Sequence, residues 1–219
     1  YVMGATGPKD LFLIIDRSGS MKNHGRMDNA KAAAKLVVST LTHTDYMNVV
    51  QFSTTAYSEN TYLVPAESLY RSTMSSFIDD MMPSGYTYYT KAMDLAFEIA
   101  DRSDGEGFTT NCTRIFIFVS DGEPSEADGT ASFVADIEAA RRPTDMFFLC
   151  GLGAGGEAAT LQAAACAIGG IYIQVADDDA DELNDAMASY YQYLALGNMI
   201  NEVQPVRWSE PYESIPDIW

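Results

Sequence analysis

Residues 11–20, LFLIIDRSGS, decide the fold of this chain. Residues 11–15 form a continuous apolar run, which is typical of a strand buried on both faces. Such strands occur in parallel sheets that helices cover on both sides. The run stops at Asp16, and a short polar loop follows. This stretch therefore predicts an α/β protein in which Asp16 stands at the carboxyl end of a central strand.

The rest of the chain continues as an alternation of strands and helices. Further strands are predicted at residues 47–52, 114–119, 146–150 and 171–175, with a short edge strand around residues 56–63. Helices are predicted at residues 28–41, 73–82, 90–100, 131–141, 156–168 and 180–196. This order predicts a Rossmann-like, doubly wound, mostly parallel sheet with helices on both faces. In such sheets, ligand sites lie beyond the carboxyl ends of the strands.

One domain is predicted over residues 10–196. Residues 197–219 combine prolines with tryptophans and lack a helical or strand period, so we expect an extended segment there. Residues 1–9 are similarly irregular, and both flanks are expected to belong to a neighbouring domain. The chain starts at Tyr1 and shows no signal peptide, so we expect it to be an excerpt of a longer protein.

The charge of the chain excludes two classes of partner. With 31 acidic and 13 basic residues, the formal net charge is −18. This charge repels nucleic acid and anionic lipid, and it attracts cations. No apolar run approaches the roughly 20 residues that span a bilayer. We therefore expect no nucleic-acid binding and no direct membrane insertion by this stretch.

Three polar segments are predicted at the same edge of the sheet. Asp16, Ser18 and Ser20 follow the first buried strand, and Asp121 follows the strand at residues 114–119. Thr87 lies between two predicted helices. Together they offer two carboxylates and three hydroxyls without a histidine or cysteine. Such an oxygen-only set suits Mg²⁺, Ca²⁺ or Mn²⁺ better than Zn²⁺ or Cu²⁺.

The number of protein oxygens limits what such a centre can do. Three or four of them leave at least one of the six positions around Mg²⁺ open to water or a ligand atom. Hydroxyl ligands add no charge, so an incoming carboxylate is attracted to the ion. The predicted partner is therefore a protein that presents an Asp or Glu side chain.

These motifs resemble the metal-ion-dependent adhesion site (MIDAS) of von Willebrand factor A (VWA) domains and integrin inserted domains. The resemblance rests on Asp-x-Ser-x-Ser, a later threonine and an Asp-Gly, each in register with the strand order, and it covers about residues 9–196. It implies that Ser18 and Ser20 ligate the ion directly. It also implies that Thr87 binds directly or through water, depending on state. Asp16 and Asp121 would act directly or through bridging waters.

A narrower resemblance is to the alpha-two-delta auxiliary subunits of voltage-gated calcium channels. It rests on YVMGA at residues 1–5, PKD at 8–10, GYT at 85–87, NC at 111–112, AC at 165–166 and VRW at 206–208. In that family the VWA domain is inserted in an extracellular Cache-type sensory domain. The resemblance implies an extracellular or cell-surface location, flanks that belong to a Cache-like host, and a channel or other membrane protein as partner.

The favoured function is a cation-dependent protein-binding module without enzymatic activity, and two alternatives stay open. One is a metal-assisted phosphohydrolase with Asp16 as nucleophile, which would need a lysine near the phosphate; no motif lysine is evident. The other is an intracellular VWA domain that serves as an assembly platform. The cysteine state and glycan occupancy would separate this second alternative from the extracellular hypothesis.

Individual residues also have simpler interpretations. Asp16 and Asp121, taken singly, could be helix caps. Thr90 competes with Thr87 as the threonine of the site, and the spacing from Gly85 favours Thr87. The tyrosines beside the site form either a recognition surface or packing under a loop; they are Tyr86, Tyr88 and Tyr89.

The cysteines allow one internal pairing. Cys112 precedes a strand, whereas Cys150 ends one, so a strand length of about 17–20 Å separates them. This exceeds the roughly 7 Å that bridged Cα atoms allow. If the domain holds a disulfide, it joins Cys112 to Cys166, near the lower end of its helix. Cys150 is expected to be a buried free thiol. The alternative is that Cys166 bridges to another part of the parent chain, which would leave Cys112 free. Asn111 starts an Asn-Cys-Thr glycosylation motif.

Overall fold

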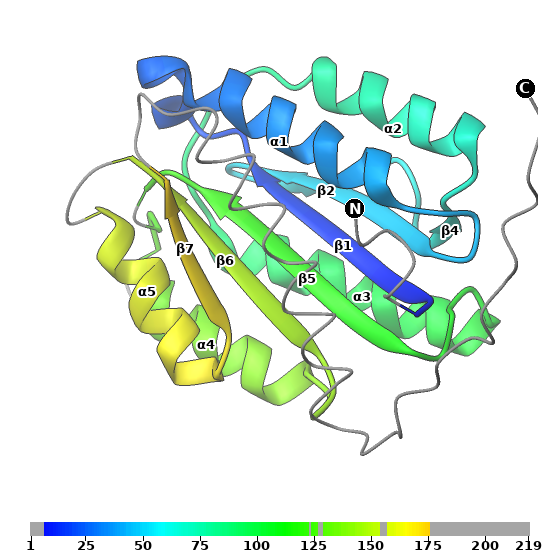
Figure 1. Ribbon diagram of the computed structural model, residues 1–219. Coiled ribbons are helices and arrows are strands. Elements are labelled where there is room, and N and C mark those ends of the chain that lie inside the picture. The colour runs from blue at the N-terminus through cyan, green and yellow to red at the C-terminus, as the bar shows by residue number, and fades with distance from the viewer. Residues whose placement is uncertain (1–6, 123, 127–128, 154–156, 176–219) are drawn as a thin grey trace, which may run out of the picture.

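The computed structural model describes residues 7–122, 124–126, 129–153 and 157–175 (Figure 1). The strands are β1 (Lys9–Asp16), β2 (Tyr46–Phe52), β3 (Ala56–Tyr57), β4 (Val64–Pro65), β5 (Thr113–Ser120), β6 (Met146–Leu152) and β7 (Ile171–Val175). The helices are α1 (Arg26–Thr40), α2 (Ser68–Asp79), α3 (Tyr89–Glu106), α4 (Gly129–Ala140) and α5 (Glu157–Ile168). A 3-10 helix, η1 (Gly19–Gly25), leads into α1.

The sheet has the predicted, mostly parallel topology. Its strands follow the order β3-β2-β1-β5-β6-β7, and β4 pairs with β2. β1, β2, β5, β6 and β7 run parallel, whereas β3 and β4 are short antiparallel additions to β2. The carboxyl ends of the parallel strands therefore meet at one edge, which we call the C-terminal edge (Figure 1).

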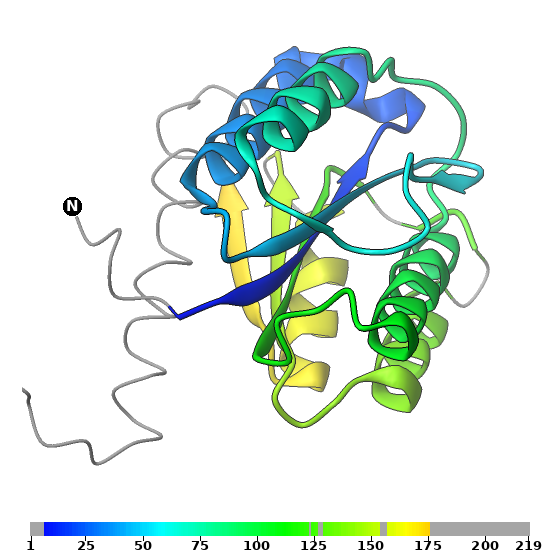
Figure 2. The same ribbon diagram turned by 90° about the vertical axis from the view of Figure 1, so that its right-hand side faces the viewer.

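Helices cover both faces of the sheet, as expected for a doubly wound fold. Helices α1 and α2 lie on one face, and α3, α4 and α5 lie on the other (Figure 2). Leu11, Leu13 and Ile15 of β1 pack toward α1 and α2, whereas Phe12 and Ile14 pack toward the other helices. Because successive side chains alternate between the two faces, a strand covered on both sides has to be apolar throughout.

Aromatic packing ties the three central strands together. Phe12, Phe116 and Phe147 lie in direct register on β1, β5 and β6. Their rings stack with centroids 4.6 and 4.9 Å apart. Aromatic contacts of this kind contribute about 0.5–1.5 kcal/mol each beyond burial of their area. The strands that carry the C-terminal edge are thus held in fixed register.

Two helix boundaries differ from the prediction by five or six residues, because these exposed turns carry no regular apolar spacing. Helix α2 begins at Ser68 rather than residue 73, and its first turn is exposed, with Leu69 79% exposed. Helix α3 continues to Glu106 and ends at Gly107, whose φ is +80°. The predicted helix at residues 180–196 lies outside the described residues.

The edge strand predicted at residues 56–63 is instead two strands of two residues, β3 and β4. The buried Asn48 of β2 explains the break, because its amide donates to the carbonyl oxygens of Asn60 and Tyr62, each at 3.0 Å. Ser58 Oγ in turn donates to Asn48 Oδ1 at 2.6 Å. A side chain therefore satisfies backbone groups that a longer strand would have paired.

All three cysteines are free thiols in this structure. Cys150 is buried in β6, and burial raises the pKa of its thiol to about 12. Cys112 and Cys166 are both exposed, so the bridge between them stays a prediction. Asn111 is exposed too, in a left-handed turn with φ +56°, and its glycosylation is likewise untested.

Candidate metal centre

Three loops converge at the C-terminal edge, and backbone hydrogen bonds hold two of them together. Gly19 N donates to the Gly85 carbonyl at 3.0 Å, and Ser84 N donates to the Arg17 carbonyl at 2.7 Å. Gly85 has a φ of +86°, and a Cβ there would lie 2.7 Å from Thr54 Oγ1. The loop that carries Thr87 therefore needs glycine at position 85 on both counts.

A continuous chain of hydrogen bonds joins four of the five predicted ligands. Ser18 N donates to Asp16 Oδ1 at 2.6 Å, and the hydroxyl oxygens of Ser18 and Ser20 lie 2.9 Å apart. Ser20 Oγ then donates to Asp121 Oδ1 at 2.7 Å. The structure thus brings together groups that stand 101 residues apart in the sequence.

Asp16 is fully buried, and its environment disfavours an isolated negative charge. Burial raises the pKa of this carboxyl to about 7, although hydrogen bonds from Ser120 and Ser18 act in the opposite direction. Ser120 Oγ donates to Asp16 Oδ2 at 2.5 Å, and the Tyr89 hydroxyl donates to Ser120 Oγ at 3.0 Å. No described lysine or arginine forms an ion pair with Asp16. A divalent cation would supply the opposing charge, so these residues fit a metal.

Thr87 lies beside these hydrogen-bonded residues but takes no part in their hydrogen bonds. It is buried, and its backbone is held by Ser125, since Thr87 N donates to Ser125 Oγ at 3.1 Å and Ser125 N to the Thr87 carbonyl at 2.7 Å. Its hydroxyl forms no hydrogen bond with the other four predicted ligands, all of which the structure describes. Thr90 has the simpler role, because its hydroxyl donates at 2.8 Å to Glu126, which also caps the first turn of α3.

The three tyrosines beside the site divide between the two interpretations. Tyr89 packs among Phe52, Phe118 and Phe133, and burial raises the pKa of its hydroxyl well above the usual value. Tyr86 is 65% exposed at the C-terminal edge. Tyr89 therefore belongs to the core, Tyr88 is half-buried, and the exposed Tyr86 is available to a partner.

Sequence reasoning missed a basic residue that lies within the centre. Arg26, the first residue of α1, places Nη1 2.9 Å from Asp121 Oδ2. The ion pair joins residues 95 positions apart, and both side chains are almost completely buried. The only sequence signal is an arginine just ahead of an apolar helix, and that signal is too common to identify a site.

Comparison with known proteins agrees with this geometry. The family model for the von Willebrand factor type A domain matches residues 11–123, more than half of the 219-residue chain. Voltage-dependent calcium channel subunit alpha-2/delta-3 of Homo sapiens is 26% identical over 217 residues, covering 97% of this chain and 19% of that protein. Voltage-dependent calcium channel unc-36 of Caenorhabditis elegans is 31% identical over 109 residues, covering 45% of this chain and 8% of that protein.

Solved structures share the fold at lower identity. A von Willebrand factor type A protein from Catenulispora acidiphila superposes with a TM-score of 0.71 at 21% identity, covering 87% of this chain and 42% of that one. Proximal thread matrix protein 1 from the mussel byssus, solved with a zinc-occupied MIDAS motif, gives a TM-score of 0.64 at 17% identity, covering 90% and 47%. The chain spans less than a fifth of the calcium-channel relatives it matches. It belongs to the von Willebrand factor type A domain family, and within that family it is similar to the alpha-2/delta subunits.

Proposed function

We propose that this chain is a divalent-cation-dependent protein-binding module. A metal ion at the C-terminal edge, held by Asp16, Ser18, Ser20, Thr87 and Asp121, coordinates an Asp or Glu carboxylate of a protein partner. The observation that carries the proposal is the fully buried Asp16, which lacks a cationic partner among the described side chains yet lies in one hydrogen-bonded chain with three other oxygen donors.

The chemistry of the donors sets the class of ion. Among the described residues, no group of three or more His, Cys, Asp or Glu side chains could hold a metal, so a metal here depends on serine and threonine hydroxyls. Such hard oxygens favour Mg²⁺, Ca²⁺ or Mn²⁺. When bound, the ion supplies a Lewis acid that attracts a carboxylate. The zinc-occupied motif of the mussel protein supports a divalent ion at this type of site.

The rim of the centre offers a surface for the partner. Tyr86 and Met82 are 65% and 70% exposed, and both lie on the loop that carries Thr87. Arg17 Nη1 braces this loop by donating to Ser84 Oγ at 2.8 Å. Tyrosine, methionine and arginine are enriched at protein interfaces. We infer that these side chains contact the residues that flank the partner's carboxylate.

The relatives suggest where the module works. Because they are subunits of voltage-dependent calcium channels, we infer an extracellular or cell-surface location and a channel or other membrane protein as partner. No described helix is long and apolar enough to cross a membrane. We assign the VWA domain to residues 10–196 and the flanks at 1–9 and 197–219 to a Cache-like host domain. An intracellular assembly platform remains the alternative.

The proposed function predicts which peptides the domain selects. In Mn²⁺, selection of random displayed peptides on the immobilised domain should enrich sequences that share one Asp or Glu. Binding of each peptide should disappear in EDTA, and also when that residue is changed to Asn or Gln, because the ion would then lose the negatively charged oxygen of the partner. Enrichment of peptides that lack a carboxylate, or that bind equally well in EDTA, would contradict the proposal.

We also infer that the centre performs no hydrolysis. A phosphohydrolase would use Asp16 as nucleophile, but this side chain is fully buried and both its oxygens already accept hydrogen bonds. We expect no turnover of p-nitrophenyl phosphate with Mg²⁺ or Mn²⁺. Metal-dependent turnover that Asp16→Asn removes would overturn this inference and favour the phosphohydrolase alternative.

A further inference from the structure

Arg26 forms an ion pair with one of the two carboxylates of the metal centre, that of Asp121. Its guanidinium lies 2.9 Å from Asp121 Oδ2, whereas Asp121 Oδ1 accepts the Ser20 hydroxyl at 2.7 Å. The side chains of Arg26 and Asp121 are 9% and 0% exposed, so water screens this ion pair weakly. Both oxygens of Asp121 are therefore already engaged by neighbouring side chains.

The position of Arg26 is fixed from the opposite side by Gly153, which follows β6. A Cβ on Gly153 would lie 2.5 Å from Arg26 Nη2, and the residue has a φ of +104°. Gly153 N also donates to the Val175 carbonyl at 2.9 Å, which anchors this backbone to β7. The guanidinium is thus enclosed between the loop after β5 and the loop after β6.

This placement changes the charge that the protein offers to an ion. Asp16 and Asp121 together would neutralise a divalent cation, but Arg26 offsets the charge of Asp121. Arg26 therefore makes the described side chains around a bound divalent ion less negative than the two carboxylates alone would be. In a buried site the remaining positive charge acts strongly on its surroundings, and a partner's carboxylate would balance it.

We propose that Arg26 is a positioning residue that keeps Asp121 from direct contact with the ion, so that Asp121 acts through bridging water and ion binding depends on the partner's carboxylate. The proposal rests on the metal centre proposed above. Its consequence is thermodynamic coupling, because an ion that needs the carboxylate and a carboxylate that needs the ion must strengthen each other equally. The free domain would hold the ion weakly, and the complex would hold it tightly.

Calorimetry with Mn²⁺, without a partner, tests the role of Arg26. The expected effect of removing this side chain is a gain in Mn²⁺ affinity. Arg26→Gln removes the positive charge, and we expect it to bind Mn²⁺ about ten- to a hundredfold more tightly, because a like charge no longer lies close to the buried ion. Arg26→Lys keeps the charge and should stay near the wild-type affinity. A purely structural role for Arg26 predicts the opposite result for Arg26→Gln, because a damaged site binds its ion more weakly.

A second measurement begins with the wild-type domain itself. Excess acetate, as a stand-in for the partner's carboxylate, should tighten Mn²⁺ binding to the wild-type domain about tenfold, and Arg26→Gln should lose most of this gain. Wild-type affinity that ignores acetate would overturn the proposal even if Arg26→Gln failed to fold. If the wild-type domain and Asp16→Asn bind Mn²⁺ alike, the metal centre itself is wrong. If only Asp16→Asn loses Mn²⁺ and Arg26→Gln is unchanged or weaker, the centre stands and only the role of Arg26 is wrong.

Discussion

Changing Asp16 to Asn should abolish the binding of Mg²⁺, Ca²⁺ and Mn²⁺, with a rise in Kd of at least about a hundredfold. Substitutions around metal ligands already cost ten- to a hundredfold, and Asp16 supplies a full negative charge at the centre. Asparagine keeps the shape of the side chain, and its amide oxygen can still accept from Ser18 N. The expected loss therefore reports the missing charge rather than a collapsed loop, and calorimetry with each ion measures it.

Asp10 provides a matched control at the other end of the same strand. It is 1% exposed, against 0% for Asp16, and it accepts hydrogen bonds from Thr110 N at 2.8 Å and from the Thr109 hydroxyl. Asp10→Asn should leave ion binding unchanged, because Asp10 lies where the parallel strands begin, at what we call the N-terminal edge of the sheet. In chelator, Asp16→Asn should unfold in urea at the wild-type midpoint or above it, since a buried charge is costly without its counter-ion. Equal ion affinity in Asp16→Asn and wild type would refute the centre.

The candidate centre could be predicted from sequence where its residues follow buried strands. Asp16 comes directly after one apolar run, and Asp121 follows Ser120 at the end of another. Parallel strands bring their carboxyl ends to one edge. Ser18 and Ser20 follow within the same loop. The hydrogen-bonded chain among these four residues confirms the predicted convergence, although it does not test the ion itself.

Arg26 could not be predicted, because its role depends on a contact between distant loops. Nothing in a single sequence says which of the 31 acidic residues an arginine meets. The need for glycine at position 153 likewise follows only from the structure, where the Arg26 guanidinium packs against it. The start of α2 and the end of α3 differ from the prediction for a related reason, since these exposed turns lack the apolar spacing on which the prediction depended.

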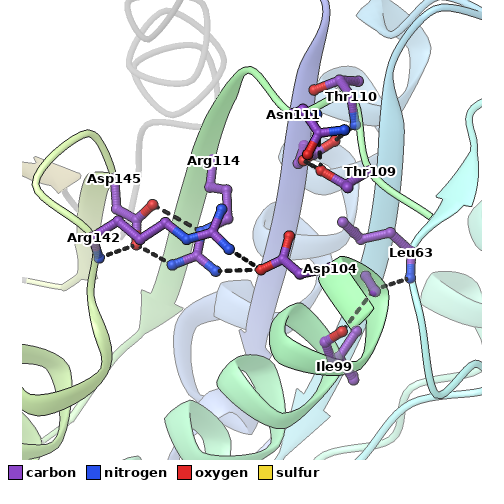
Figure 3. Close-up of polar contacts among 11 residues, drawn as sticks. Leu63, Ile99, Asp104, Thr109, Thr110, Asn111, Arg114, Arg142 and Asp145 are labelled. Carbon is purple, nitrogen blue, oxygen red and sulfur yellow. Dashed lines mark hydrogen bonds and ion pairs between the residues drawn. The ribbon is translucent and has the colours of Figure 1, made fainter. Parts of the chain in front are cut away.

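Two buried ion pairs at the N-terminal edge could also not be predicted from the sequence. Lys9 Nζ lies 3.1 Å from Asp45, next to the start of β2, and Arg114 forms a two-pronged contact with Asp145, next to the start of β6 (Figure 3). Asp45 and Asp145 also accept the backbone N–H three residues before them, each at 2.8 Å. The same short turn therefore leads into two strands, with a buried cation on each aspartate.

Arg114→Met should be the most destabilising of the substitutions considered, at about 3–5 kcal/mol, because it leaves a buried carboxylate without its cation. Arg114 Nε and Nη2 donate to Asp145 at 2.8 and 2.5 Å, and the two side chains are 3% and 0% exposed. Asp104 lies 3.5 Å from the same guanidinium and also pairs with Arg142 (Figure 3). Urea unfolding monitored by circular dichroism measures the loss in the free energy of unfolding.

Two comparisons separate the buried charge from simple loss of packing. The double variant Arg114→Met with Asp145→Leu should be more stable than Arg114→Met alone, because replacing a buried ion pair by apolar groups is often close to neutral. Glu98→Gln breaks the exposed Arg102–Glu98 pair, whose side chains are 38% and 61% exposed, and it should cost no more than about 0.5 kcal/mol. Mn²⁺ affinity should stay unchanged in all three variants, since none touches the C-terminal edge. A double variant less stable than Arg114→Met would mean that the aspartate stabilises the turn before β6 through its backbone contact rather than through its ion pair.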